Sequence, residues 1–143
     1  MGLVNPTAKM SKSENNPNDA IYLLDPPEVI RQKIARARTD SSTEGVRFDP
    51  GRPGIYNLAV IYQLFSRETP EVIEARYSDK GYADFKRDLA DVVIEGLRPL
   101  QSRYADLAHD PAEIERLLKQ GADRASSVAE RTLREVKERV GLG

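Results

Sequence analysis

Three stretches of this sequence carry the same helix-start signal. They are DPPEV from Asp25, TPEVI from Thr69 and DPAEI from Asp110. Asp and Thr are favoured at the N-cap of a helix, and proline is favoured at the first helical position, where its missing N–H costs no hydrogen bond. Glu28 and Glu113 follow their caps by three residues, which is the spacing of a capping box. These signals predict three helices that begin at the proline after each cap.

Apolar residues repeat with helical spacing over most of the chain. The repeat covers residues 54–65, 82–107 and 114–140. A stripe of this kind buries one face of a helix against a core. Pro99 lies inside the second stretch, and because the stripe keeps its phase on both sides, we expect the helix to bend there and not to end. The expected fold class is all-α, a bundle of about five helices preceded by an extended loop.

The last of these stretches has small residues in the middle of its apolar stripe. Gly121, Ala122 and Ala125 lie on the same face as Ile114 and Val140. Small side chains let a second helix approach closely. The middle of this face could therefore accept another helix at close range.

Composition excludes several classes of site. At 143 residues with 39% apolar residues, the chain has the size of one ordinary domain with a real core. It has no cysteine, which excludes disulfides, thiolate zinc sites and thiol nucleophiles. The single histidine, His109, lies between two helical stretches and is expected at the surface or at a helix end. No metal site and no Ser/His/Asp triad is predicted.

No stretch approaches the roughly 18 apolar residues of a membrane span, and the first residues lack the apolar run of a signal peptide. We therefore expect a cytoplasmic protein with no membrane partner. The net charge of −1 argues against binding nucleic acid by bulk electrostatics. Any anion binding must be local.

Two segments remain open to more than one interpretation. Between Arg31 and Arg38 the sequence has four cations and no acid, which indicates a solvated helix face or, alternatively, a contact with RNA phosphates. The turn-rich loop 39–54 is long for a connector, and in it Val46 and Phe48 alternate with Arg47 as in a short strand or bulge.

The pentapeptide KMSKS near the start places two cations and two hydroxyls within five residues, Lys9, Met10, Ser11, Lys12 and Ser13. Each ammonium offers three donors as a compact charge, and the hydroxyls add donors between them. The pattern suits a polyphosphate, although an ordinary basic tail would also contain it. It is not a P-loop, because GxxxxGK[ST] is absent.

KMSKS is the second signature motif of class I aminoacyl-tRNA synthetases. Five segments, in order, resemble the C-terminal part of a bacterial tryptophanyl-tRNA synthetase. They are GLVNPTAKMSKS, IYLLDPPEVIRQKIARARTDS, RPGIYNLAVIY, GYADFKRDLADVVIEGLRPLQSRY and GADRASSVAERTLREVKERVGL. The resemblance covers essentially the whole chain, and the ordered series is more specific than the lysine motif alone.

The resemblance implies a reaction in which tryptophan and ATP with Mg²⁺ give tryptophanyl-adenylate, whose tryptophanyl group then passes to tRNA(Trp). Lys9 and Lys12 would be the catalytic cations that stabilise pyrophosphate, and Met10, Ser11 and Ser13 would complete the phosphate-binding loop. Residues 1–24 would form this loop and its connection, and residues 25–143 a helical domain that faces the tRNA anticodon. The complete enzyme would be a homodimer.

The chain lacks the nucleotide-binding Rossmann half of that family, with its HIGH-type motif and tryptophan pocket. Met1 falls where the family chain would still be completing that half, so we expect an internal methionine and no adenylate synthesis by these 143 residues alone. Two alternatives remain: a stand-alone helical module that binds RNA or a partner without catalysis, and a related enzyme such as the tyrosyl synthetase.

Overall fold

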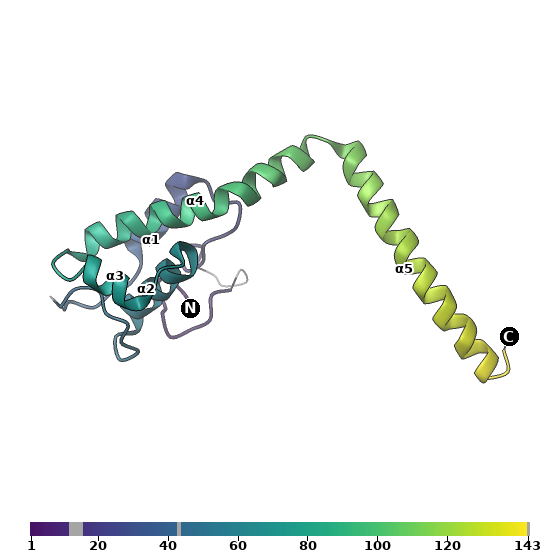
Figure 1. Cartoon of the computed structure of the whole chain (residues 1–143), viewed down its shortest axis with the longest axis horizontal. Coiled ribbons are helices and arrows are strands. Elements are labelled where there is room, and N and C mark those ends of the chain that lie inside the picture. Colours follow the sequence, from purple (N-terminus) through teal and green to yellow (C-terminus); the bar gives the residue numbers. More distant parts are fainter. Residues whose placement is uncertain (12–15, 43, 143) are drawn as a thin grey trace. The chain divides into compact units, whose positions relative to one another are not determined.

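The computed structural model describes residues 1–11, 16–42 and 44–142. Within these ranges the protein has five helices and no strand, so the all-α prediction is confirmed. The helices are α1 (Pro27–Arg36), α2 (Pro53–Ser66), α3 (Pro70–Arg76), α4 (Tyr82–Ala108) and α5 (Pro111–Arg139), as Figure 1 shows. In the described part of the chain, no helix combines the length and the apolar character needed to cross a lipid bilayer.

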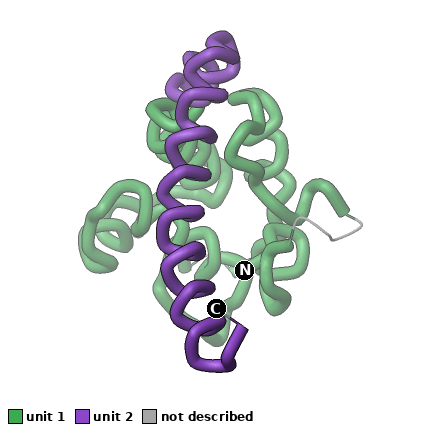
Figure 2. The backbone as a smooth tube through the Cα atoms, turned by 90° about the vertical axis from the view of Figure 1, so that its right-hand side faces the viewer, with its two compact units in different colours: residues 1–101 green, residues 102–143 purple. Residues whose placement is uncertain are grey.

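The chain divides into two compact units, residues 1–101 and 102–143 (Figure 2). The first unit contains the N-terminal loop, α1, α2, α3 and most of α4, and the second contains the end of α4 and α5. Residues 1–24 share the first unit with the three helices that follow them. The predicted division at residue 24 concerned roles in catalysis and RNA binding, and it stays a prediction.

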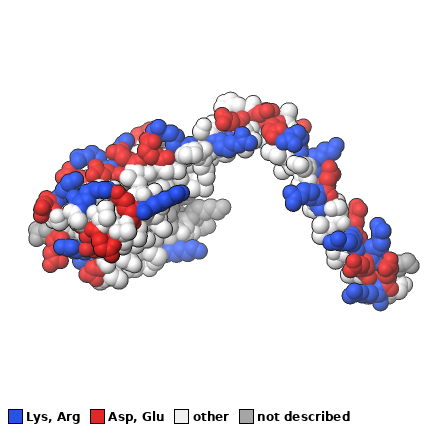
Figure 3. All heavy atoms as spheres, in the orientation of Figure 1, with Lys and Arg blue, Asp and Glu red and all other residues white. Residues whose placement is uncertain are grey.

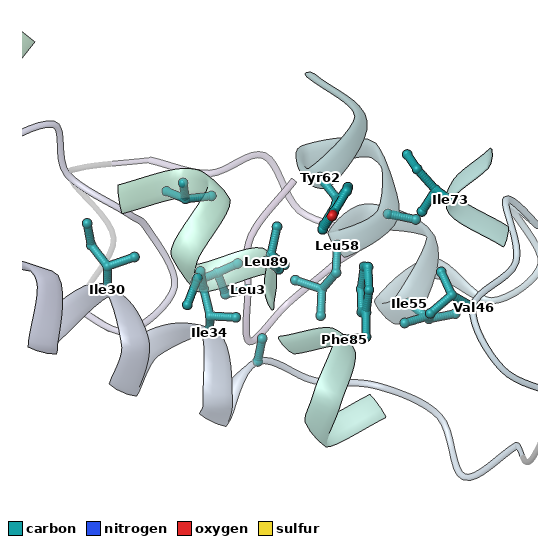
Figure 4. Packing of buried hydrophobic residues seen from close by; sticks show 14 of the residues in the cluster. Leu3, Ile30, Ile34, Val46, Ile55, Leu58, Tyr62, Ile73, Phe85 and Leu89 are labelled. Atoms are coloured by element: carbon teal, nitrogen blue, oxygen red, sulfur yellow. The ribbon is translucent and has the colours of Figure 1, made fainter. Parts of the chain in front are cut away.

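The core of the first unit is formed by one face of each of its helices (Figure 4). Its fully buried side chains come from α1, α2, α3 and α4, from the segments between them and from the loop before α1: Leu3, Ile30, Ile34, Val46, Ile55, Leu58, Ile73, Tyr77, Phe85, Leu89 and Val93. Tyr62, Tyr77 and Phe85 form an aromatic cluster with ring centroids 5.0 to 5.7 Å apart. The helical spacing therefore predicted the buried faces correctly from Ile55 to Tyr62 in α2 and from Phe85 to Leu97 in α4, whereas Phe65 is 38% exposed.

Helix α4 runs without interruption through Pro99, which confirms that the helix does not end there, and the bend at Pro99 stays a prediction. Its apolar stripe is buried from Phe85 to Leu97, whereas Leu100 and Tyr104 are exposed. The apolar stripe thus predicts the length of α4 correctly. The apolar side chains in the last turns of α4 are not covered by the core of the first unit.

Two of the three predicted helix starts are confirmed, since Pro70 and Pro111 are the first residues of α3 and α5. The Asp110 carboxylate accepts a hydrogen bond from the Glu113 amide at 3.0 Å, as an N-cap should. The predicted cap at Asp25 is wrong by one residue, because α1 begins at Pro27 and Pro26 is its N-cap. A residue that precedes proline is restricted to extended backbone, and Pro26 has φ −67° and ψ 157°.

The small-residue face of α5 is open within the second unit. None of the residues of α5 is buried, and beyond the neighbouring residues and backbone of the helix itself no heavy atom lies within 4 Å of the position that a Cβ on Gly121 would take. No strand occurs in the described residues of the 39–54 loop. There the Phe48 amide donates to the Glu74 carboxylate at 2.7 Å, so a side chain takes the place of a neighbouring strand, while Val46 is fully buried.

Candidate functional site

The described part of the lysine motif consists of Lys9, Met10 and Ser11. Lys9 is exposed, with its ammonium available to solvent anions, and the Met10 side chain packs against the core of the first unit. Met10 thus anchors the motif between its cation and its first hydroxyl. Lys12 and Ser13 lie outside the described residues.

The residues before the motif are attached to α2 and to the end of α1. The buried Asn57 side chain of α2 donates to the carbonyl of Gly2 at 3.0 Å. The amide of Arg38, just after α1, donates to the carbonyl of Leu3 at 2.8 Å. Leu3 itself is buried in the core. The motif therefore projects from a base that belongs to the folded core.

The cations between Arg31 and Arg38 do not form one solvated face. Lys33 points inward, where its ammonium donates to the Asp25 carboxylate at 2.6 Å and to the carbonyl of Ala20 at 2.9 Å. Arg31 pairs with Asp91 of α4. Of these four cations, Arg36 and Arg38 are exposed and form no ion pair with the described residues, so the positive surface here is smaller than the sequence suggests.

Acidic and basic side chains also alternate over the rest of the visible surface of the first unit and along α5 (Figure 3). This distribution agrees with the net charge of −1. The face that Figure 3 shows therefore has no broad field of a single sign.

A polar cluster links the 39–54 loop to the start of α4. Arg52 forms two hydrogen bonds with the Asp40 carboxylate, from Nε at 3.0 Å and from Nη2 at 3.1 Å. The Tyr82 hydroxyl donates to the same carboxylate at 2.9 Å. The bonds from Arg52 are the main cause that lowers the pKa of Asp40 to about 2, and burial raises the pKa of Tyr82 to about 12.

This cluster borders a cavity of about 330 Å³, which is also lined by Thr7 and Arg38. The cavity brings the segment before the lysine motif next to the 39–54 loop. Sequence reasoning missed the cluster, because Asp40 and Tyr82 are 42 residues apart and no local pattern pairs them. The length of the loop was the one signal that pointed to it.

His109 follows the last residue of α4 and is exposed, with Nδ1 2.6 Å from the carbonyl oxygen of Ala105. This position confirms the prediction of a helix-end residue. Within the described residues, no group of three or more His, Cys, Asp or Glu side chains could hold a metal ion.

Comparison with known proteins identifies the family. Residues 1–98 match the family model described as "tRNA synthetases class I (W and Y)". The chain belongs to this family. The resemblance inferred from the lysine motif and the segments after it is therefore confirmed.

Within the synthetase family, the relatives point to the tryptophan branch. The chain is 51% identical over 142 residues to a tryptophan–tRNA ligase of Wolinella succinogenes, and 50% identical over 144 residues to one of Bacillus anthracis. Each match covers 99% of this chain and 43% of the relative. The chain thus spans less than half the length of the relatives that it matches, in agreement with the absence of a Rossmann half.

Solved structures agree with the sequence comparison. A tryptophanyl-tRNA synthetase from Mycoplasma pneumoniae superposes with a TM-score of 0.80 at 31% identity, covering 100% of this chain and 45% of that one. The enzyme from Campylobacter jejuni, complexed with ADP and tryptophan, has a TM-score of 0.75 at 25% identity over 99% of this chain and 44% of that one. The all-α fold of this segment is therefore shared with synthetases of the tryptophan branch.

Proposed function

We propose that the complete protein is a tryptophan–tRNA ligase. The observation that carries the proposal is the identity of about half of all residues, over 99% of the chain, to tryptophan–tRNA ligases. The reaction would join tryptophan to ATP, which brings its own Mg²⁺, with release of pyrophosphate, and then transfer the tryptophanyl group to tRNA(Trp). The protein would act as a homodimer in the cytoplasm.

In this proposal, residues 1–24 supply the phosphate-binding loop. The ammonium groups of Lys9 and Lys12 donate to the oxygens of the departing pyrophosphate, where negative charge increases in the transition state. Met10, Ser11 and Ser13 shape the loop and its remaining phosphate contacts. The exposed ammonium of Lys9 and the anchoring of Met10 in the core support this role.

Residues 25–143 would face the tRNA. The exposed guanidinium groups of Arg36 and Arg38, at the end of α1, offer donors to RNA phosphates. The alternative of a stand-alone binding module is not favoured, because the matched relatives are ligases along the entire chain.

The test is pyrophosphate exchange into ATP by the complete protein, measured with tryptophan and, separately, with tyrosine. We expect exchange that depends on tryptophan. Exchange that depends on tyrosine would identify the protein as a tyrosyl synthetase. No exchange with either amino acid would contradict the ligase activity. The 143-residue chain alone should show none, because the nucleotide and tryptophan pockets lie in the part that it lacks.

A further inference from the structure

Asp19 is a buried carboxylate that no part of the proposed function uses. It is only 4% exposed and lies just after the lysine motif, beside the residues that come before it. One of its oxygens, Oδ1, accepts hydrogen bonds from the amides of Val4 at 2.7 Å and Asn5 at 2.8 Å. The carbonyl of Asp19 also accepts from the Leu3 amide at 2.9 Å.

These bonds continue toward Lys9 along the backbone. The amide of Ala8 donates to the carbonyl of Asn5 at 3.1 Å, and the carbonyl of Ala8 accepts from the amide of Gly2 at 2.9 Å. Ala8 is the residue directly before Lys9. A short series of hydrogen bonds therefore connects Asp19, through Asn5, to the residue that carries Lys9 into solvent.

The other end of this series is fixed to the core. Gly2 and Leu3 are held by Asn57 and by the Arg38 amide. Gly2 lies so close to Asp19 that a Cβ on Gly2 would overlap the Asp19 carboxylate. The Asp19 carboxylate is thus packed against Gly2 and bonded to the amides of Val4 and Asn5. Moving this carboxylate would break its hydrogen bonds to Val4 and Asn5.

We propose that Asp19 is a positioning residue for Lys9. Its carboxylate holds Val4 and Asn5, Asn5 holds Ala8, and Ala8 fixes the backbone from which the Lys9 side chain extends. A charged acceptor binds two amides more strongly than a neutral one would. Preorganised cations stabilise a transition state without reorganising during the reaction, so the hold on Ala8 would contribute to the rate. The expected effect on the rate rests on the proposed function, whereas the role of Asp19 in holding Ala8 does not.

The structural content is tested on the 143-residue chain by amide hydrogen exchange. Asp19→Ala should accelerate exchange at Val4 and Asn5 by about tenfold or more, because their hydrogen bonds to a charged group are lost. Exchange at Ala8 should accelerate as well, because its acceptor is the carbonyl of Asn5, which Asp19 no longer holds. Amides in the middle of α4 should be unaffected. The matched control is Asp49→Ala, which removes an exposed carboxylate that accepts from the Gly51 amide at 2.8 Å in another loop. Unchanged exchange at Ala8 in Asp19→Ala would overturn the inference.

If Asp19→Ala does not fold, Asp19→Asn replaces it, since the amide keeps a neutral oxygen acceptor. Faster exchange confined to Val4, Asn5 and Ala8 supports the inference, and a uniform rise through the first unit overturns it. Gly2→Ala displaces the same carboxylate from the other side and should give the same pattern.

The catalytic consequence is tested on the complete protein. Asp19→Ala should lower kcat for tryptophan-dependent pyrophosphate exchange by about tenfold and leave KM for tryptophan unchanged, and Asp19→Asn should restore part of kcat. A raised KM for tryptophan with unchanged kcat would overturn the positioning role. If the unaltered complete protein shows no tryptophan-dependent exchange, the ligase proposal fails, and hydrogen exchange still decides whether Asp19 holds Ala8.

Discussion

Lys33 shows how a single residue in a basic run can have a structural role. Its side chain is 6% exposed and that of its partner Asp25 is 12% exposed, with 2.6 Å between Nζ and Oδ2. The ammonium also bonds the carbonyl of Ala20, so it joins α1 to the residues just after the lysine motif. Removing one member of a buried pair leaves the other charge without compensation.

We therefore expect Lys33→Ala to lower the free energy of unfolding by about 3 kcal/mol. Arg36→Ala, three residues further along the same helix, is the matched control, because Arg36 is exposed and should change stability by less than about 0.5 kcal/mol. Urea unfolding of both variants measures the difference. Equal losses would mean that the pair with Asp25 contributes nothing specific.

Asp40 gives the protein a defined sensitivity to acid. Its folded-state pKa is about 2, below the ordinary value of 3.8, mainly because Arg52 donates to it. The unfolded chain therefore binds a proton more readily than the folded chain, and stability is complete above about pH 4 and falls as pH drops toward 2. Because the carboxylate is 31% exposed, solvent screening limits the effect to about 1 kcal/mol.

Asp40→Asn should remove this part of the acid sensitivity. The difference in free energy of unfolding between the unaltered protein and the variant should be largest near pH 6 and shrink between pH 4 and 2, as measured by urea unfolding at each pH. A difference that stays constant over that range would show that the charge of Asp40 does not contribute.

Lys12 lies outside the described residues, and the role proposed for it rests on the lysine motif. In the complete protein, Lys12→Ala should slow adenylate formation by about 10- to 100-fold, the equivalent of one hydrogen bond to a charged group. Tryptophan affinity should change much less. Single-turnover kinetics measures the rate of adenylate formation, and equilibrium binding measures the affinity for tryptophan. Equal losses in rate and affinity would show that Lys12 does not act specifically on the transition state.

At the scale of elements, the sequence pattern within a few residues predicted where helices begin better than it predicted which distant residues they contact. Pro70 and Pro111 begin helices because the signal is contained within a few residues. Asp25 failed as a cap because Pro26 must stay extended before Pro27 and because Lys33, eight residues away, binds the carboxylate. The Asp40 cluster depends on a residue of α4, so no pattern within the loop could predict it.

Two glycines in helices should respond oppositely to alanine. A Cβ on Gly54, in the first turn of α2, would lie 2.5 Å from the carbonyl oxygen of Arg38, so Gly54→Ala must push backbone apart and should cost about 2 kcal/mol or more. Gly121 in α5 has open space around it, and Gly121→Ala should raise helix stability by about 0.5 to 1 kcal/mol. Thermal unfolding monitored by circular dichroism compares the two. Unchanged or higher stability of Gly54→Ala would contradict the close contact at Gly54, and lower stability of Gly121→Ala would contradict the open space at Gly121.

At the scale of the whole molecule, the two units differ in how their helices are stabilised. In the first unit, α4 contributes Phe85, Leu89 and Val93 to a shared core, so its middle turns open only when that core opens. The 29 residues of α5 include no buried residue, and Leu118 in its apolar stripe is 68% exposed. Helices without tertiary packing are marginal in water and open locally.

We therefore expect amides of α5 in the 143-residue chain to exchange with solvent at least about 100-fold faster than amides of α4 between Leu89 and Val93, as measured by hydrogen exchange and mass spectrometry. The ratio should not depend on protein concentration, because α5 has no buried residue in the single chain. Slow exchange in α5 that becomes faster on dilution would show that a second copy buries its apolar stripe. Slow exchange independent of concentration would contradict the expectation and would show that other residues of the same chain cover the apolar stripe of α5.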